Sequence, residues 1–243
     1  MIKFIVFCTK ILVVAIVALL FSSCNQAFNG IKGDGNVQIE QRKIDENFTK
    51  ISVNRGLEVI VEQADVIGVE VEADQNLLSH ITTKVVNGTL EISSDENIYS
   101  AEKETIRVKM PTIESLETTG GSNLSSKNTL KGLNLELKTN SGSEIEVTSE
   151  FDNISSESTS GSHITISGKA LKFTSESSSG SEIDAKSLLV NEVISQSTSG
   201  SSTSVHPLVS LKAKASSGSS IEYDGTPKKI EKEETSGGSV SKL

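Results

Sequence analysis

The chain has 243 residues, a formal net charge of −9 and 4% aromatic residues, with no tryptophan. A chain this acidic is not expected to bind nucleic acid or an anionic membrane surface by electrostatics. The scarcity of aromatic side chains argues against a sugar-binding platform of rings and against a large conventional core.

The first 23 residues have the features of an export signal. Lys3 and Lys10 are followed by the apolar run Ile11–Phe21, and then by small residues and Cys24. This order is typical of a secretory signal, and the run is shorter than the roughly 20 residues that span a bilayer. Leu20–Cys24 resembles a bacterial lipobox with phenylalanine three places before the cysteine, which implies cleavage before Cys24 and lipidation of its thiol. An uncleaved anchor or an ordinary cleaved signal is the alternative.

We therefore expect a lipoprotein signal at 1–23 and a lipid-anchored tether at 24–32. The expected location is the bacterial outer membrane, with the protein facing either the periplasm or the exterior. Cys8 lies within the signal and Cys24 at the cleavage point, so the domain that follows has no cysteine for a disulfide or a thiolate metal site. That domain must be held together by packing and hydrogen bonds.

Residues 33–115 are predicted to form irregular β-strands. Alternating apolar and polar residues occur in NVQIEQ, KISVNRGLEVIVEQ, GVEVEA and ETIRVKM. Asn87–Gly88, between KVV and TLEIS, predicts a two-residue β-hairpin, and Gln75–Ile81 predicts a short helix or a turn. We expect this region to cover the first rung of the repeats that follow, because an open sheet edge is prone to association.

Residues 116–243 contain seven copies of a unit of about 19 residues. In each copy a glycine is followed three residues later by a mostly apolar anchor residue. The glycines are Gly121, Gly142, Gly161, Gly180, Gly200, Gly218 and Gly237, and the anchors are Leu124, Ile145, Ile164, Ile183, Thr203, Ile221 and Val240. Every second residue between them is apolar or small, from Leu133 to Val147 and from Leu171 to Ala185, which indicates β-strands with one buried face. A disordered serine-rich linker would lack this phase.

A β unit of this length suits one coil of a β-solenoid, with rungs about 4.8 Å apart. Each glycine then makes a corner, where a side chain would clash or where φ must be positive. The serines beside it face inward if the alternation continues through the corner, and outward if the glycine forms a bulge. Stacking also predicts one outward column seven residues before the anchors: Glu117, Lys138, Glu157, Glu176, Gln196, Lys214 and Glu233.

The sequence resembles the family of the "putative auto-transporter adhesin, head GIN domain". The resemblance rests on Gly33–Gln63, Asn87–Ile92, Ile106–Leu124 and the recurring Ser-Gly-Ser before an apolar residue, and it covers nearly all of the chain after Cys24. It implies an all-β, single-stranded right-handed β-helix with one GIN-type domain at 33–243, often on a lipoprotein. It brings no catalytic residues.

No residue pattern in the chain predicts catalysis. The only histidines are His80, His163 and His206, serine is too abundant for a Ser-His-Asp combination to be informative, and no GxSxG elbow occurs. Glu144, His163 and Glu182 would stack on consecutive rungs and are the best candidates for a weak cation site, although an exposed, solvated strand explains them more simply. We predict no catalytic residue, cofactor or resident metal.

The predicted function is that of a non-enzymatic lipoprotein anchored in the cell envelope through Cys24. It would act as an adhesin or as a binding or structural module for an unidentified envelope protein or polysaccharide, and not for nucleic acid. The alternative is a carbohydrate-active β-helix enzyme, either a polysaccharide lyase or a hydrolase. Such an enzyme would need clustered carboxylates, or a basic residue with calcium, on one outer face.

Overall fold

The computed structural model describes residues 30–243, and the predicted signal and Cys24 lie outside them. The described residues form strands and turns without any helix, and so contain no helical segment able to cross a membrane. The strands are β1 (Ile31–Lys32), β2 (Val37–Arg42), β3 (Lys50–Val53), β4 (Glu58–Gln63), β5 (Gly68–Asp74), β6 (Ile81–Val86), β7 (Thr89–Ser94), β8 (Ile98–Ser100), β9 (Glu104–Met110), β10 (Ser115–Thr118), β11 (Asn123–Ser126), β12 (Leu130–Thr139), β13 (Glu144–Ser158), β14 (His163–Ser177), β15 (Glu182–Ser197), β16 (Ser202–Ser216), β17 (Ser220–Tyr223), β18 (Lys229–Thr235) and β19 (Ser239–Lys242).

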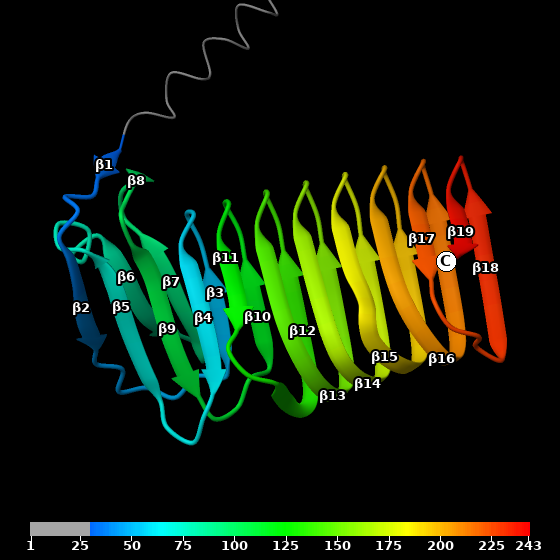
Figure 1. Cartoon of the computed structure of the whole chain (residues 1–243), viewed down its shortest axis with the longest axis horizontal. Helices are drawn as coiled ribbons and strands as arrows, with labels where there is room; N and C mark the ends of the chain where they lie inside the picture. Colours follow the sequence, from blue (N-terminus) through cyan, green and yellow to red (C-terminus); the bar gives the residue numbers. More distant parts are fainter. Residues whose placement is uncertain (1–29) are drawn as a thin grey trace, which may run out of the picture.

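The strands stack along one axis in two facing layers (Figure 1). We call the layer before each repeat turn face A; it contains β3, β10, β12, the second halves of β13–β16, and β18. The layer after each turn is face B; it contains β4, β11, the first halves of β13–β16, β17 and β19. Successive rungs pair in parallel, with Ile145 opposite Ile164 and Ile164 opposite Ile183. The predicted β-solenoid is confirmed.

Each repeat turn is a two-residue type I′ turn. At Ser160–Gly161 the φ angles are 56° and 70°, and the N–H of Ser162 donates to the carbonyl of Thr159 at 3.3 Å. A Cβ on Gly161 would meet nothing within 4 Å, so the glycine is favoured by its backbone conformation and not by crowding. The Gly161 N–H also donates to the carbonyl of Ser179 on the next rung at 3.1 Å. All seven predicted glycines have positive φ.

The serines that flank each turn face inward, which resolves the two orientations left open by the sequence. Because the turn has two residues, the alternation resumes in phase after it, and Ser158 and Ser162 are both buried while Ser160 is exposed. The Ser177 hydroxyl lies 2.8 Å from that of Ser197, 3.0 Å from that of Ser201 and 2.9 Å from that of Thr203. These four buried hydroxyls therefore satisfy one another across the two layers.

A second corner, opposite the turns, breaks the predicted alternation. Between Phe151 and Ile154, two consecutive residues face the solvent, and the same occurs between Ala170 and Phe173. Leu171 is consequently 51% exposed although strict alternation predicted it to be buried, and Leu133, with the same prediction, is 69% exposed. The phase shifts here because the strand bends from face B to face A. The bend leaves a ridge of exposed apolar side chains: Leu133, Leu171, Leu189, Leu208 and Val209.

The N-terminal strands extend the two layers in an order that differs from the sequence. β3 lies between β7 and β10, and β4 lies between β9 and β11. The intervening Arg55–Gly56 turn has φ of 65° and 78° and is an eighth member of the column of turns. β6 and β7 form the predicted hairpin, antiparallel with Val86 opposite Thr89. Gln75–Ile81 is a turn, in which the Leu77 carbonyl accepts from the N–H groups of His80 and Ile81.

A buried carboxylate fixes the loop that enters the domain. Asp74 is fully buried and accepts hydrogen bonds from the N–H groups of Gly35 at 3.1 Å, Glu102 at 3.2 Å and Lys103 at 3.3 Å. Ile31–Lys32, which the sequence placed in the tether, form β1 and pair with β8. The folded domain therefore includes these two residues.

Candidate binding surface

The outer surface of face A carries the predicted column of charged residues. Its members lie directly opposite one another from Glu117 through to Glu233, which confirms the predicted register. Lys214 forms an ion pair with Glu233 at 2.9 Å. Lys138 contacts Glu136 on its own strand at 2.7 Å, and this hydrogen bond lowers the pKa of the Glu136 carboxyl and raises that of Lys138.

A second column, nearer the turns, consists mainly of hydroxyl side chains. It contains Thr119, Asn140, Thr159, Ser178, Thr198, Ser216 and Thr235. The Thr159 hydroxyl donates to the Asn140 side-chain carbonyl at 3.0 Å, and the Ser216 hydroxyl donates to that of Thr198 at 3.1 Å. Both bonds run from one rung to the next, so they link neighbouring members of the column along the axis of the stack.

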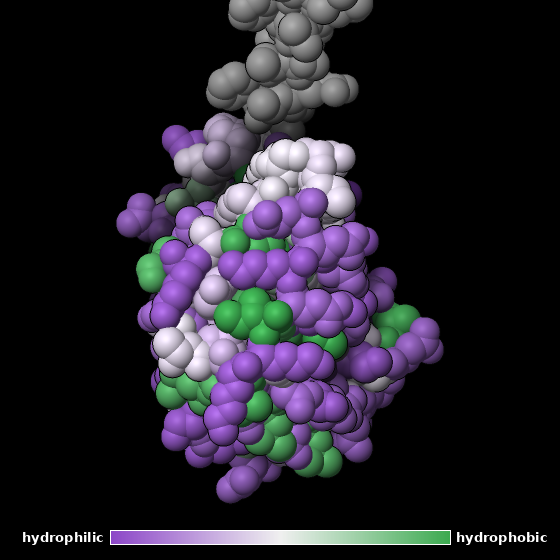
Figure 2. All heavy atoms as spheres, turned by 90° about the vertical axis from the view of Figure 1, so that its right-hand side faces the viewer, coloured by the Kyte–Doolittle hydropathy of each residue, from purple (hydrophilic) through white to green (hydrophobic). Residues whose placement is uncertain are grey.

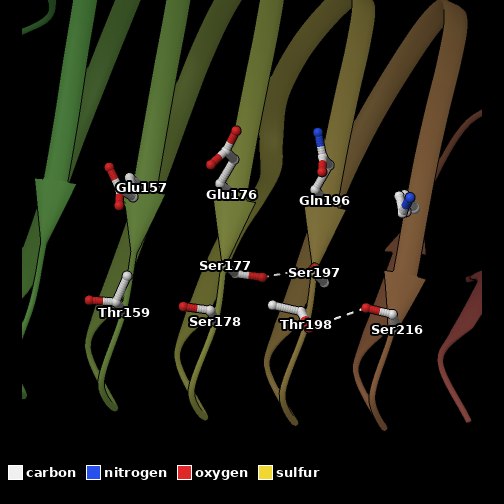
Figure 3. A pocket seen from close by; sticks show the side chains of 10 residues that line it. Glu157, Thr159, Glu176, Ser177, Ser178, Gln196, Ser197, Thr198 and Ser216 are labelled. Atoms are coloured by element: carbon white, nitrogen blue, oxygen red, sulfur yellow. Dashed lines mark hydrogen bonds between the residues drawn. The ribbon is translucent and has the colours of Figure 1, made fainter. Parts of the chain in front are cut away.

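A shallow trough lies between the two columns. Glu157, Glu176, Gln196 and Lys214 form one side, and Thr159, Ser178, Thr198 and Ser216 form the other. Figure 3 shows these side chains on neighbouring strands, with Ser177 and Ser197 between the two rows. Each rung contributes one residue to each side, so the same pair of polar positions recurs along the trough.

Face B holds the candidate cation site suggested by the sequence. Glu144, His163 and Glu182 lie opposite one another on consecutive rungs. His163 Nδ1 is 3.4 Å from the Glu182 carboxylate, and its Nε2 is 3.0 Å from the Thr165 hydroxyl. Across residues 30–243, no three histidine, aspartate or glutamate side chains are arranged to hold a metal ion. The three residues therefore form a polar surface column.

The other histidines occupy separate places with partners of their own. His80 Nδ1 contacts Asp95 at 2.9 Å, in the N-terminal strands. His206 Nδ1 lies 3.2 Å from the Lys186 carbonyl. The hydroxyl partners of the buried serine Ser177 are other serines and a threonine. The structure thus does not bring a histidine to the repeated serines.

One carboxyl group in the N-terminal strands has a shifted pKa. Burial raises the pKa of Glu104, and the negative charges of Glu58 and Asp74 raise it further. The Glu104 Oε2 atom is buried and has no hydrogen-bond partner. The group lies away from the trough, and its effect is expected on stability.

The family of the chain is decided by a match that spans most of the stack. The model of the family described as "Putative auto-transporter adhesin, head GIN domain" matches residues 47–227. The chain belongs to this GIN-domain family. The matched range of the GIN domain includes the turns from Arg55–Gly56 to Ser217–Gly218.

Solved structures of other proteins share this fold. A "putative adhesin" from Bacteroides fragilis NCTC 9343 is 20% identical, with a TM-score of 0.80 over 88% of this chain and 100% of that one. A "putative adhesin" from Parabacteroides merdae ATCC 43184 is 18% identical, with a TM-score of 0.73 over 88% and 99%. A "Putative lipid binding protein" from Parabacteroides distasonis ATCC 8503 is 21% identical, with a TM-score of 0.71 over 88% and 99%. No curated protein matches the GIN-domain chain.

Two surface features of the GIN domain were missed from the sequence. The Arg55–Gly56 turn lacks the Ser-Gly pattern, but Gly56 is followed three residues later by the buried Val59, as in the other repeats. The apolar ridge was hidden by the assumption of unbroken alternation. The sequence signal for the second corner is a pair of consecutive polar residues, such as Asp152–Asn153, that interrupts the alternation of apolar and polar residues.

Proposed function

We propose that this GIN domain is a non-enzymatic binding head, held at the cell envelope by lipid on Cys24, whose trough on face A binds an extended polysaccharide. The observation that carries the proposal is the repetition within the trough. Each rung adds one hydroxyl or amide on one side and one charged or amide side chain on the other. Parallel rungs are about 4.8 Å apart, so hydrogen-bonding groups recur at a constant step, which suits a linear polymer with repeating hydroxyl groups.

The charge of the trough favours a neutral or cationic polymer. Glu157 and Glu176 are both exposed in it, and Lys214 lies at its other end. The whole chain carries a net charge of −9, so an anionic polymer would be repelled at long range. The family description as an adhesin supports a binding role.

Repetition also favours binding over catalysis. An enzyme needs one place where an acid, a base or a nucleophile differs from its neighbours in position and pKa. The side of the trough nearer the turns instead repeats nearly the same side chains from rung to rung, as Thr159, Ser178 and Thr198 illustrate. Two of the rung-to-rung junctions in this column are hydrogen-bonded, Thr159 to Asn140 and Ser216 to Thr198.

The experiment compares two double variants of equal charge. Ser178→Lys with Thr198→Lys fills the trough, and Thr165→Lys with Ser204→Lys places the same side chains on face B. All four native residues are partly exposed, so both variants should fold. Binding to a panel of neutral, cationic and anionic polysaccharides is measured by affinity electrophoresis.

The trough variant is expected to lose binding to a neutral or cationic polymer by about tenfold or more, a change of about 1.4 kcal/mol, while the face B variant binds normally. Equal binding by both variants would show that the trough is not the site. Incubation of the wild-type protein with the same panel, with and without calcium, tests the enzyme alternative. Release of shortened or unsaturated sugar products would overturn the non-enzymatic assignment.

The anchor is tested separately from the trough. The Cys24→Ser variant is expected to leave the membrane fraction and to lose the mass of the lipid. A Cys8→Ser variant is the control, because that residue belongs to the segment expected to be removed. If Cys24→Ser stays in the membrane fraction, the segment acts as an uncleaved anchor instead.

A further inference from the structure

The C-terminal end of the stack presents two strand edges. β18 pairs with β16, and β19 pairs with β17; within residues 30–243, no strand pairs with the outer edge of either. Figure 2 looks onto this end along the stack and shows mostly hydrophilic side chains with hydrophobic ones between them. An open edge with unpaired N–H and C=O groups is a template for another strand, including one from a second copy of the chain.

Two charged residues occupy inward positions in this last rung. Lys232 lies opposite Ala213, and Glu234 lies opposite Ala215. Both alanines are buried in the core, at 1% and 0% exposure. The inward columns of face A therefore change from small, uncharged residues to a cation and an anion at the final rung, where the core meets the solvent.

The two charged side chains reach across to the backbone of β19. The N–H of Ser239 donates to the Ser219 carbonyl, and the N–H of Leu243 donates to the Tyr223 carbonyl. The backbone N–H groups of these odd-numbered residues of the last segment therefore point toward the preceding rung. Successive residues of a strand direct their N–H and C=O groups to opposite edges, so those of Val240 point toward the open side of β19. Lys232 Nζ donates to the Val240 carbonyl at 3.0 Å, and the Glu234 carboxylate accepts from the Val240 N–H at 2.6 Å.

Lys232 also covers the apolar end of the core. Its ammonium lies 4.8 Å from the centroid of the Tyr223 ring, which belongs to the preceding rung on face B. This cation–π contact holds the lysine stem across the gap between the two layers. Ile230, the third inward residue of β18, remains 42% exposed beside it.

We propose that Lys232 and Glu234 form a charged lid that seals the C-terminal end of the solenoid against pairing with a second copy of this chain. A strand that paired with β19 would need the N–H and C=O of Val240, which the lid already occupies. It would also bury an ammonium and a carboxylate, which is costly unless every hydrogen bond is replaced. The lid leaves the lateral faces as the surfaces available for ligands.

The test replaces the lid with strand-forming apolar residues. Lys232→Val with Glu234→Val frees the edge of β19 and extends the apolar columns. Lys214→Val with Glu233→Val is the matched control: it removes the same residue types, an exposed ion pair at 2.9 Å, and one of them lies on the same strand. Self-association of each purified protein is measured by sedimentation velocity over a series of concentrations.

The lid variant is expected to dimerise at least about tenfold more tightly than the wild type and the control. Small-angle X-ray scattering should show a particle lengthened along one axis with an unchanged cross-section. Equal association of the two variants, or a folded lid variant that stays monomeric, would overturn the proposal. So would a dimer with a larger cross-section, since that geometry is lateral.

A third variant guards against loss of structure in the last rung. Lys232→Met keeps an unbranched stem over Tyr223 but cannot donate to the Val240 carbonyl. It is expected to associate more tightly than the wild type and less tightly than the double variant. If Lys232→Met folds and does not differ from the wild type, the lysine does not act as a lid.

Discussion

The phase shift at the second corner gives the sharpest test of the fold. Phe173 is 1% exposed and lies in the inward column between Ile154 and Val193. Phe173→Ala is expected to lower the free energy of unfolding by about 3–5 kcal/mol, from lost burial and the cavity left behind. Leu171 is two residues earlier, in the same phase by strict alternation, but it is 51% exposed. Because full burial of a leucine side chain contributes about 1.5–3 kcal/mol, Leu171→Ala should cost about 1 kcal/mol or less.

The assay is urea unfolding followed by circular dichroism, with both variants compared with the wild type. The slope of the free energy against urea should be the same for all three, so that a change of midpoint reports stability alone. A loss on Leu171→Ala equal to that on Phe173→Ala would refute the bend, because it would mean that the strand alternates without interruption. A steeper or biphasic transition in either variant would point to rungs that unfold separately.

Three further predictions concern buried or strained groups. Ser177→Ala should lower the free energy of unfolding by about 1–3 kcal/mol, since three buried hydroxyls lose a partner, whereas Ser178→Ala on the surface should cost little. Gly161→Ala should lower the free energy of unfolding by about 1 kcal/mol and Ser160→Gly should raise it by a similar amount, because both positions have positive φ; a raised urea midpoint for Gly161→Ala or a lowered one for Ser160→Gly would contradict this. The pKa of Glu104 is higher in the folded than in the unfolded protein, so the contribution of Glu104 to stability falls as the pH rises through its folded-state pKa. Glu104→Gln should therefore unfold at a higher temperature than the wild type at pH 7 and at the same temperature near about pH 4; a constant difference between the two proteins would exclude the titration.

The repeated part of the fold follows directly from local sequence rules. A residue period of two, a glycine at a fixed offset and opposite charges seven residues before the anchors are enough to place Ile164 in the core. They also align Lys214 with Glu233. These features are predictable because each rung contacts mainly its two neighbours, so that the residue pattern of one unit also gives the register of the next.

The N-terminal strands could not be ordered in this way. β3 and β4 pair with strands on either side that come later in the chain, and β5 joins two antiparallel neighbours. Such pairings depend on which edges remain open once the stack has formed, and no local pattern records that. The exposure of Leu133 and Leu171 was also missed, because the bend at the second corner depends on where the chain passes between the layers.

The trough and the lid differ in how far the sequence could reveal them. The charged and hydroxyl columns could be predicted from their fixed distance in sequence before each anchor residue. The trough between them could not, because it is formed by side chains from four rungs in register. Lys232 and Glu234 read as ordinary members of a charged strand until their inward position and their contacts with Val240 are known. A charge at a position that is small or apolar in the preceding rungs is the signal that would have found the lid.

The Gly161–Ser179 hydrogen bond recurs from turn to turn, linking Gly142 to Ser160 and Gly180 to Ser199. Because every junction along this edge is made by the same backbone groups, one unit can be removed without creating a new kind of contact. Deleting residues 162–180 would join Gly161 to Ser181 and shorten the molecule by a single step of about 4.8 Å. The length of the stack is thus set by the number of units, and because Glu176 and Ser178 would be removed with this one, the same deletion would shorten the trough by one rung.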